Sequence, residues 1–316
     1  MKVIDFHCDT MLRITESEQG AGLKENDFQV DIGKLKQGKV LAQFFALFFE
    51  LDGIGKNKSP FDHTMGMLQR FEEELKKNSR EIALAKGSGD LLKNEQEGKI
   101  SAFLTIEEGE AMEGSLDKLW TFHQRGVRLI TLTWNHENHI GFPNIRYENR
   151  DRGLKSFGKE VVEAMNHLNM LIDVSHLSDG GFWDVARLSK KPFIASHSNA
   201  RSVKAHQRNL SDDMLKALGN GGGATGLNFA HYFLSGDDHS KIQPMLRHMR
   251  HIINVAGLEA LVFGTDFDGI SSELEIENIG EIQRLIAAME QGGFSSKEIE
   301  YITHKNGVRL IREVLG

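Results

Sequence analysis

The chain has 316 residues, of which 40% are hydrophobic and 26% charged, as in ordinary globular proteins. A net charge of -7, with no basic stretch interleaved with aromatic residues, argues against a nucleic-acid-binding protein. The single cysteine, Cys8, excludes an intramolecular disulfide, and no apolar run approaches the roughly 20 residues of a membrane span. We therefore expect a cytoplasmic protein without a leader peptide, which binds neither nucleic acid nor a membrane.

Short apolar runs bounded by turn residues recur along the chain and predict eight strands. Most of these runs are continuous rather than alternating, as in strands that are buried on both faces of a parallel sheet. The predicted strands span residues 3–7, 40–49, 101–107, 127–134, 170–176, 193–198, 223–229 and 261–266.

Helical periodicity fills most of the intervals between these strands. It predicts helices over residues 62–79, 157–168, 180–189, 212–219 and 243–256. Ser211 is expected to cap one of these helices, and Ser295 with Glu298 has the spacing of a capping box before a further helix. The longer polar stretches between elements predict loops over residues 15–36, 52–61, 135–155 and 230–242.

Strands that alternate with helices predict right-handed β-α-β units, and eight of them predict an α/β fold of the (β/α)8 TIM-barrel type. An open doubly wound sheet is the alternative. It is disfavoured because no glycine-rich phosphate loop follows the first strand. Without a low-complexity linker or an internal repeat, residues 1–316 are expected to form one barrel domain.

Five of the predicted strands end in a histidine or a carboxylate. These residues are His7 with Asp9, Glu107, His176, His197 and Asp266. All such strand ends converge at one face of a barrel, where the crowded imidazoles and carboxylates would need positive charge among them. Mixed nitrogen and oxygen ligands suit Zn²⁺, with Mn²⁺ or Co²⁺ as alternatives. Six groups exceed one tetrahedral zinc site, so we expect two divalent ions that share a bridging carboxylate.

Each of these residues has a simpler interpretation when it is taken singly. A strand-end histidine is more often a hydrogen-bonded structural residue than a metal ligand. Glu107 has Glu108 and Glu110 as close competitors. The simpler interpretation would require five strands to end in this way independently, and that coincidence favours the metal site.

Three neighbouring residues are expected to support the site rather than to bind metal. Cys8 alternates with His7 along the strand and should face the opposite side. Asp5 and Asp173 fall inside predicted strands, where a structural or supporting role is expected.

Around these residues the chain resembles the renal (membrane) dipeptidase family, which comprises zinc peptidases on an amidohydrolase-like barrel. The resemblance runs in order along nearly the whole chain, and so it does not depend on one motif. The matching segments are DFHCDT at 5–10, LTIEEGEAMEGSL at 104–116, GVRLITLTWN at 126–135, IDVSHLS at 172–178, PFIASHSNARSVKAHQRNLSDDML at 192–215 and FGTDFDG at 263–269.

The resemblance implies how the ligands divide between two metal ions. His7, Asp9 and Glu107 would hold one ion, and Glu107, His176 and His197 would hold the other. Glu107 would thus be the bridge and would also count among the catalytic residues. The family further implies a homodimer.

The resemblance also implies the groups that handle the substrate. Arg208, a surface charge by spacing alone, matches the arginine that binds the substrate carboxylate, and Asp266 matches the acid/base carboxylate. The family pattern LTLTH reads LTLTW here, so Trp134 takes the place of a substrate-contacting histidine. His136 and His139 follow closely and could reach the same space.

The predicted function is a binuclear metal-dependent dipeptidase that hydrolyses dipeptides, L,D-dipeptides included, by a metal-bridged hydroxide. Asp266 would take the proton and return it to the leaving amine. One alternative is an amidohydrolase that acts on another small amide, a lactone or an N-acyl amino acid. Another, of a different class, is a metal-binding but non-catalytic peptide-binding protein.

Overall fold

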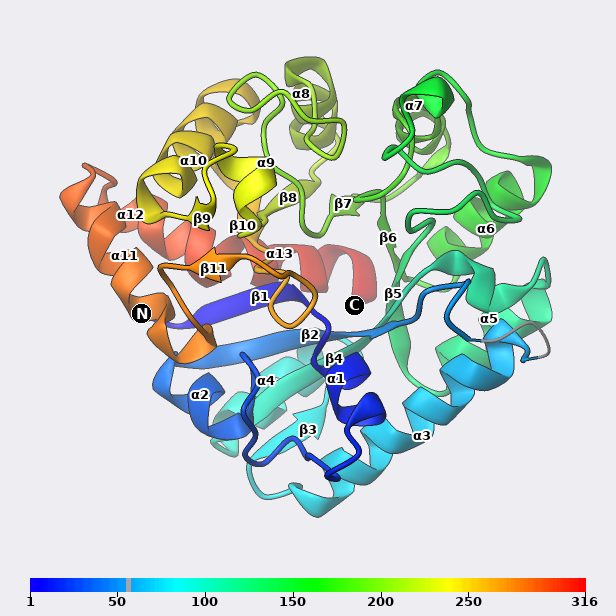
Figure 1. Cartoon of the computed structure of the whole chain (residues 1–316), viewed down its shortest axis with the longest axis horizontal. Coiled ribbons are helices and arrows are strands. Elements are labelled where there is room, and N and C mark those ends of the chain that lie inside the picture. The colour runs from blue at the N-terminus through cyan, green and yellow to red at the C-terminus, as the bar shows by residue number, and fades with distance from the viewer. Residues whose placement is uncertain (55–57) are drawn as a thin grey trace.

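The computed structural model describes residues 1–54 and 58–316, and within them eight parallel strands close into a barrel (Figure 1). Neighbouring strands follow the order β2-β1-β10-β8-β7-β6-β5-β4, and pairing of β2 with β4 closes the ring. The barrel strands are β1 (Val3–Cys8), β2 (Val40–Phe48), β4 (Ile100–Glu107), β5 (Val127–Thr131), β6 (Leu171–Asp173), β7 (Ile194–Ala195), β8 (Ala224–Leu227) and β10 (Leu261–Phe263). The predicted (β/α)8 fold is confirmed.

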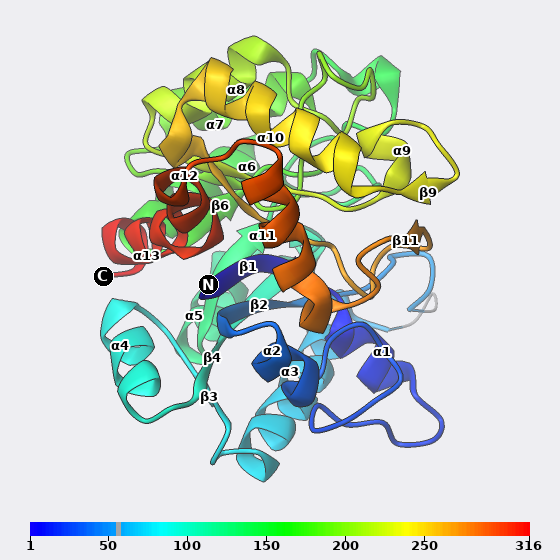
Figure 2. The same ribbon diagram turned by 90° about the vertical axis from the view of Figure 1, so that its left-hand side faces the viewer.

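Helices surround the strands on the outside of the barrel (Figures 1 and 2). In the first half of the chain they are α1 (Thr10–Glu16), α2 (Ile32–Gln37), α3 (Pro60–Lys77), α4 (Ser88–Gln96), α5 (Leu116–Gln124) and α6 (Ser156–His167). In the second half they are α7 (Asp179–Leu188), α8 (Asp212–Asn220), α9 (His231–Leu234), α10 (Ile242–Ala256), α11 (Ile282–Gln291), α12 (Ser296–Glu300) and α13 (Asn306–Leu310). Across the described ranges, no helix combines the length and apolar character needed to cross a bilayer.

The helix starts confirm the two caps expected from the sequence. The Ser211 hydroxyl accepts a hydrogen bond from the backbone N–H of Met214 and so caps α8. At α12, Ser295 and Glu298 form both hydrogen bonds of a capping box. These local signals predict helix starts well because a cap bonds to a backbone group only a few residues away.

Three short strands escape the sequence analysis: β3 (Ile82–Leu84), β9 (His239–Ser240) and β11 (Glu273–Leu274). β3 extends the sheet beside the start of β4, while β9 and β11 pair with each other apart from the barrel. Segments this short show no hydrophobic period. The predicted loop over 230–242 contains α9 and β9, and residues 55–57 of the loop predicted over 52–61 lie outside the described residues.

Several predicted strands extend too far at their carboxyl ends, among them 170–176 and 193–198. The pairing stops early because the Asp173 side chain replaces part of the backbone ladder. Its Oδ1 accepts the backbone N–H groups of Ser175 (3.0 Å) and Ser196 (2.8 Å). The histidines expected at these strand ends therefore lie in the turns just beyond them.

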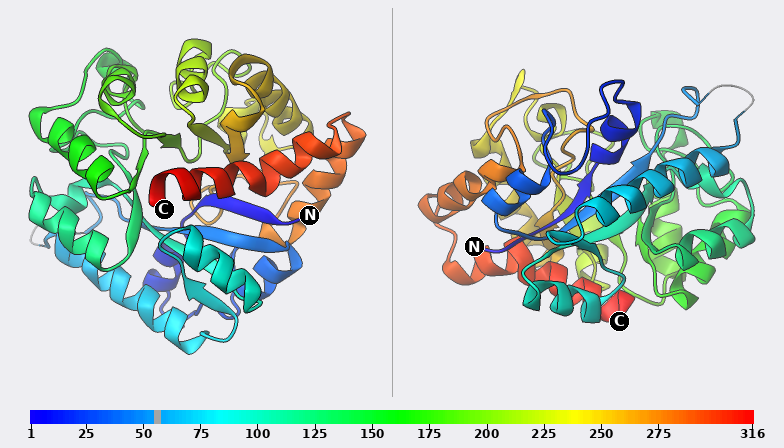
Figure 3. Two further views of the ribbon diagram at one scale, coloured as in Figure 1. Left: turned by 180° about the vertical axis from the view of Figure 1, so that it is seen from behind. Right: turned by 90° about the horizontal axis from the view of Figure 1, so that it is seen from below.

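Aromatic side chains fill the amino-terminal half of the barrel interior. The rings of Phe6, Phe44 and Phe103 stack in a row, with centroid distances of 4.4 and 4.6 Å. The carboxyl-terminal helical segment crosses this end of the barrel, where Leu310 and Ile311 join the same cluster (Figure 3). The barrel interior is therefore closed by apolar side chains at one end, and its polar side chains lie at the other end.

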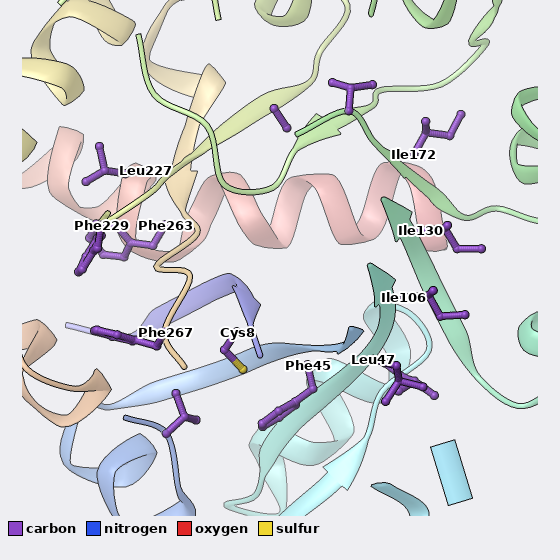
Figure 4. Packing of buried hydrophobic residues seen from close by; sticks show 14 of the residues in the cluster. Cys8, Phe45, Leu47, Ile106, Ile130, Ile172, Leu227, Phe229, Phe263 and Phe267 are labelled. Atoms are coloured by element: carbon purple, nitrogen blue, oxygen red, sulfur yellow. The ribbon is translucent and has the colours of Figure 1, made fainter. Parts of the chain in front are cut away.

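A second apolar layer lies between the strands and the helices. Ile106, Ile130 and Ile172 come from three successive barrel strands and belong to this outer cluster, as Phe45 of β2 does (Figure 4). Cys8 also packs in this layer, so it faces away from His7 as expected. With both faces of the strands buried, the barrel is a rigid frame for the side chains at its open end.

Candidate metal centre

Six polar side chains from five strands meet at the carboxyl-terminal mouth of the barrel. Each is less than a tenth exposed. We call these residues the metal cluster: His7, Asp9, Glu107, His176, His197 and Asp266. They are the residues that the sequence analysis selects from strand ends, and the barrel brings them together.

Glu107, the last residue of β4, stands at the centre of the metal cluster and faces histidines on two sides. Its Oε2 lies 3.2 Å from Nε2 of His7. Its Oε1 lies 2.9 Å from Nε2 of His176 and 3.5 Å from Nε2 of His197. The two oxygens of this carboxylate thus face two different sets of side chains. The first set is on the side of His7, and the second contains His176 and His197.

The first of these sets contains two further carboxylates. Nε2 of His7 lies 3.3 Å from Oδ2 of Asp9 and 3.7 Å from Oδ1 of Asp266. Asp9 is no longer in the strand: it occupies the N-cap position of α1 with φ -103° and ψ 21°, and its side chain makes no hydrogen bond to the helix. Its carboxylate still faces His7, as predicted, although by a turn rather than by strand alternation.

In the second set, hydrogen bonds indicate which imidazole nitrogens carry lone pairs. The Ser196 hydroxyl donates to Asp173 (2.6 Å), so its oxygen accepts from Nδ1 of His197 at 2.7 Å. Nδ1 of His176 similarly faces the amide oxygen of Asn135 at 3.1 Å. Both rings therefore present an unprotonated Nε2 to the cluster, which is the tautomer that binds a metal.

Burial and mutual charge shift the pKa values throughout the metal cluster. Burial opposes charge on His7, but the Glu107 and Asp9 carboxylates outweigh it and raise the pKa of His7 well above its usual range. Burial, reinforced by Arg208, lowers the pKa of His176 to about 4. Burial raises the pKa values of Asp9 and of Asp266, the latter to about 6. The pKa values of these two carboxyl groups stay raised because the positive charge beside them does not offset the cost of burying their charged forms.

These residues fit divalent metal ions. The Nε2 atoms of His176 and His197 lie 3.0 Å apart, so two lone pairs face each other and an oxygen of Glu107. Oδ1 of Asp9 is buried without a hydrogen-bond partner among the described residues. A cation between these atoms would turn repulsion into coordination, and a mixed nitrogen and oxygen set suits zinc.

Arg208 lies beside the second set and is only 2% exposed, although its spacing suggests a surface charge. Its guanidinium donates to the backbone oxygen of Ser175, to Oγ of Ser198 (3.3 Å) and to Nε2 of His176 (2.9 Å). A buried guanidinium at the edge of the metal cluster is suited to bind a carboxylate.

The comparisons with known proteins agree with this geometry. The model of the membrane dipeptidase family, peptidase family M19, matches residues 1–315. The chain belongs to this family. An uncharacterised dipeptidase of Schizosaccharomyces pombe is 31% identical, over 98% of this chain and 79% of that protein.

Two solved structures of metallopeptidases are similar to the present one over almost the full length of each chain. A metallopeptidase of family M19, dipeptidase AC, has a TM-score of 0.90 at 27% identity, covering 100% of this chain and 99% of that one. A metallopeptidase of Rhodobacter sphaeroides, solved with a phosphinate mimic of the dipeptide L-Ala-D-Ala, has a TM-score of 0.89 at 26% identity, covering 99% of each chain. The present M19 chain is accordingly a metallodipeptidase that uses divalent metal and a peptide substrate.

In this M19 chain, Trp134 lies next to the metal cluster after the end of β5. Its ring centroid is 6.2 Å from that of His176 and 5.8 Å from that of His136. Both Trp134 and His136 are partly exposed. His139 lies elsewhere: it is exposed, and its Nδ1 is 2.7 Å from a carboxylate oxygen of Glu110. Of the two loop histidines, only His136 lies close to Trp134.

Glu108, the competitor of Glu107 in the sequence, turns away from the metal cluster. Its backbone φ is 95°, and its buried carboxylate accepts the backbone N–H of Trp134 (3.1 Å) and the side-chain amide of Asn138 (2.6 Å). Burial raises the pKa of Glu108 to about 7. Glu108 therefore holds the loop that carries Trp134.

Asn228 was missed by the sequence analysis. It follows β8, and its side-chain amide donates to Oδ2 of Asp266 at 2.7 Å and to the backbone oxygen of His197 at 3.2 Å. A search for amides as well as acids and histidines at strand ends would have found it. Asp5 fills the supporting role expected of it, because its carboxylate accepts both the N–H (2.9 Å) and the hydroxyl (2.8 Å) of Thr265.

Proposed function

We propose that this enzyme is a binuclear metallodipeptidase, with L,D-dipeptides among its substrates. The observation that carries the proposal is the position of Glu107, whose two oxygens face separate sets of ligands. His7 and Asp9 would complete one metal site, and His176 and His197 the other. Zinc suits these donors best, with manganese or cobalt as alternatives.

Two bound ions supply a water of lowered pKa and a polarised carbonyl group. The protein's own contribution begins with Asp266, whose Oδ1 is 3.7 Å from Nε2 of His7 and whose Oδ2 is held by Asn228. We assign Asp266 as the group that takes a proton during attack on the peptide and returns it to the leaving amine. The hydrogen bond from Asn228 keeps one carboxylate oxygen fixed while the other faces the cluster.

Arg208 is assigned to the carboxyl terminus of the dipeptide. The carboxylate would replace the bond that Arg208 now makes to His176 and would take up a paired interaction with the guanidinium. This charge-assisted contact limits the substrate to very short peptides, because a longer chain would extend beyond Arg208. Trp134 and His136 are assigned to contact with the rest of the substrate.

Two other functions compete with this proposal. An amidohydrolase for another small amide, a lactone or an N-acyl amino acid could use the same metal cluster. A binding protein without turnover would retain the ligands, but it would not need Asp266 in a position to transfer a proton.

The deciding experiment measures amino-acid release from L,L- and L,D-dipeptides and from N-acyl amino acids. The purified protein is stripped with a chelator and then restored with Zn²⁺ or Mn²⁺, while bound metal is counted by atomic emission. We expect two metal ions per chain and metal-dependent cleavage of dipeptides. One ion per chain would overturn the binuclear site, and turnover of the N-acyl compounds alone would favour the amidohydrolase. Two bound ions without any turnover would favour the binding protein.

A further inference from the structure

Phe48, at the end of β2, packs against Trp134 at the rim of the barrel. The two ring centroids are 4.8 Å apart with planes inclined by 56°. Both residues are partly exposed, although most large apolar side chains of the barrel strands are buried. We call Phe48 and Trp134 the aromatic wall. Its exposed area gives the mouth of the barrel one apolar side.

Strand register places the aromatic wall directly beside the metal cluster. Phe48 pairs with Glu107 across β2 and β4, and residues paired in this way point to the same face of the sheet. The alternation along β2 agrees, because Phe44 belongs to the interior cluster while Phe45 and Leu47 belong to the outer one. Phe48 therefore faces the barrel mouth next to the bridging carboxylate.

Arg208 approaches the same cluster from the side opposite Phe48. Arg208 follows β7, and in the closed order of strands β7 lies four positions from β2, which carries Phe48, and two positions from β5, which precedes Trp134. Two extended residues span at most about 7 Å. A dipeptide held by its carboxylate at Arg208, with its peptide bond over the metal cluster, therefore directs its amino-terminal residue toward Phe48 and the Trp134 ring that packs against it.

We infer that Phe48 and Trp134 form the subsite for the side chain of the amino-terminal residue and select an apolar, preferably aromatic, side chain. This inference deepens the proposed function and rests on it for the orientation of the substrate. The selectivity arises because an aromatic side chain is removed from water and packs against two rings in a tilted arrangement. A small side chain such as that of alanine would leave the wall exposed.

The test compares two series of dipeptides on the metal-loaded enzyme. One series varies the amino-terminal residue (Phe-Gly, Leu-Gly, Ala-Gly, Lys-Gly), and the other varies the carboxyl-terminal residue (Ala-Phe, Ala-Leu, Ala-Gly). We expect kcat/KM for Phe-Gly to exceed that for Ala-Gly by about 10-fold or more. A preference for Lys-Gly over Phe-Gly would overturn the inference, since it would indicate recognition of a cation.

Variants of Trp134 distinguish selective packing against the amino-terminal side chain from a general effect on turnover. Trp134→Ala should lower kcat/KM for Phe-Gly by a much larger factor than for Ala-Gly and the second series, so that most of the advantage of Phe-Gly is lost, and Trp134→Phe should retain much of that advantage. Trp120, on the outer surface of α5 and 48% exposed, is the matched control, and Trp120→Ala should behave as the wild type. An equal loss for all dipeptides in Trp134→Ala would contradict a selective subsite, as would a change confined to the second series.

Inhibitor binding distinguishes failure of this inference from failure of the proposed function. Phosphinate mimics of Phe-Gly and Ala-Gly are titrated against wild type and Trp134→Ala, with bound metal measured in both. Suppose that the wild type cleaves no dipeptide but binds the Phe-Gly mimic about 10-fold more tightly than the Ala-Gly mimic. That result would support the subsite and contradict the proposed dipeptidase activity. Equal affinity of the wild type for both mimics would overturn the inferred subsite.

Discussion

At the scale of single residues, the metal cluster depends on a backbone that approaches two carboxylates very closely. Gly269 follows a turn in which Asp266 and Asp268 have φ of 64° and 70°. A Cβ atom at Gly269 would overlap with Oδ2 of Asp9 and would lie 2.9 Å from Oδ1 of Asp266. Glycine is required here because the space that a side chain would take is occupied by groups of the cluster.

Gly269→Ala should therefore displace the Asp9 and Asp266 carboxylates and weaken metal binding by about 10-fold or more, the range seen when groups that orient metal ligands are altered. Metal affinity measured by competition with a chromophoric chelator checks this. Gly66→Ala is the control, since nothing lies within 4 Å of its Cβ position on α3. That variant should bind metal normally and gain about 0.5–1 kcal/mol in stability. Normal metal affinity in Gly269→Ala would contradict the prediction, since it would show that the backbone of this turn can shift to accommodate the methyl group.

Asp266→Asn tests the proton transfer assigned to this residue. The amide keeps the size of the side chain but cannot take a proton, so kcat should fall by at least about 100-fold while the metal content stays that of the wild type. Steady-state kinetics and metal analysis on the same preparation provide the two readouts. Asp238→Asn, at an exposed position, serves as the matched control. Unchanged turnover would remove Asp266 from this role, whereas loss of metal would make it a ligand.

At the scale of elements, His248 of α10 joins the segment after β7 to the end of α9. Its Nδ1 accepts the backbone N–H of Ala200 at 3.1 Å, and its Nε2 donates to the backbone oxygen of Leu234 at 2.9 Å. The side chain is fully buried, and burial lowers its pKa to about 4. The neutral ring thus connects α10 by hydrogen bonds to α9 and to the segment that leads to Arg208.

This link predicts how stability depends on pH. The unfolded chain binds a proton at His248 below about pH 6.5, whereas the folded chain does so only below about pH 4. Stability should therefore be full above pH 6.5 and fall as the pH drops toward 4, with about 3 kcal/mol from this residue.

Urea unfolding of the metal-free protein at pH 7 and pH 4.5 measures the effect. His248→Gln should be less stable than wild type at pH 7, by about 1–3 kcal/mol for the altered buried hydrogen bonds. The difference should shrink at pH 4.5, because glutamine does not titrate. His167→Gln, at an exposed position on α6, should follow the wild type at both pH values. Parallel stability curves for wild type and His248→Gln would contradict the assignment.

At the scale of the whole molecule, the barrel is closed at one end by apolar packing and held at the other by polar groups. The amino-terminal end contains the stacked phenylalanines and the carboxyl-terminal helical segment. The carboxyl-terminal end collects the metal cluster from five strands that are far apart in sequence. Metal ions bound there would link the first and last strands of the barrel to those between them.

Metal removal should therefore lower the stability of the entire barrel. Ions that bind only the folded chain add about 2.7 kcal/mol each at a hundred-fold excess over Kd. Thermal unfolding with and without chelator, followed by restoration of Zn²⁺, should show a reversible fall in Tm. A His176→Ala, His197→Ala double variant should show a smaller response to chelator than wild type. A Tm that does not respond to chelator in the wild type would contradict a structural contribution from the ions.

The sequence alone determined the alternation of strands and helices and the residues of the metal cluster. These features are encoded locally: apolar runs mark the buried strands, and a polar residue after each run lies at the barrel mouth wherever the strand is placed. The family motifs added the predicted role of Arg208 in binding the substrate carboxylate, which its spacing in the chain does not indicate. The cytoplasmic location, the single domain and the homodimer stay predictions.

Only the tertiary structure decided which side chains face one another. It turned Glu107 into the cluster and Glu108 away from it, buried Arg208, and brought Phe48 of β2 against Trp134 of the loop after β5. It also ended the strands early, through carboxylates that take the place of the backbone ladder. These outcomes depend on contacts between segments that are remote in sequence, and no local pattern of residues specifies such contacts.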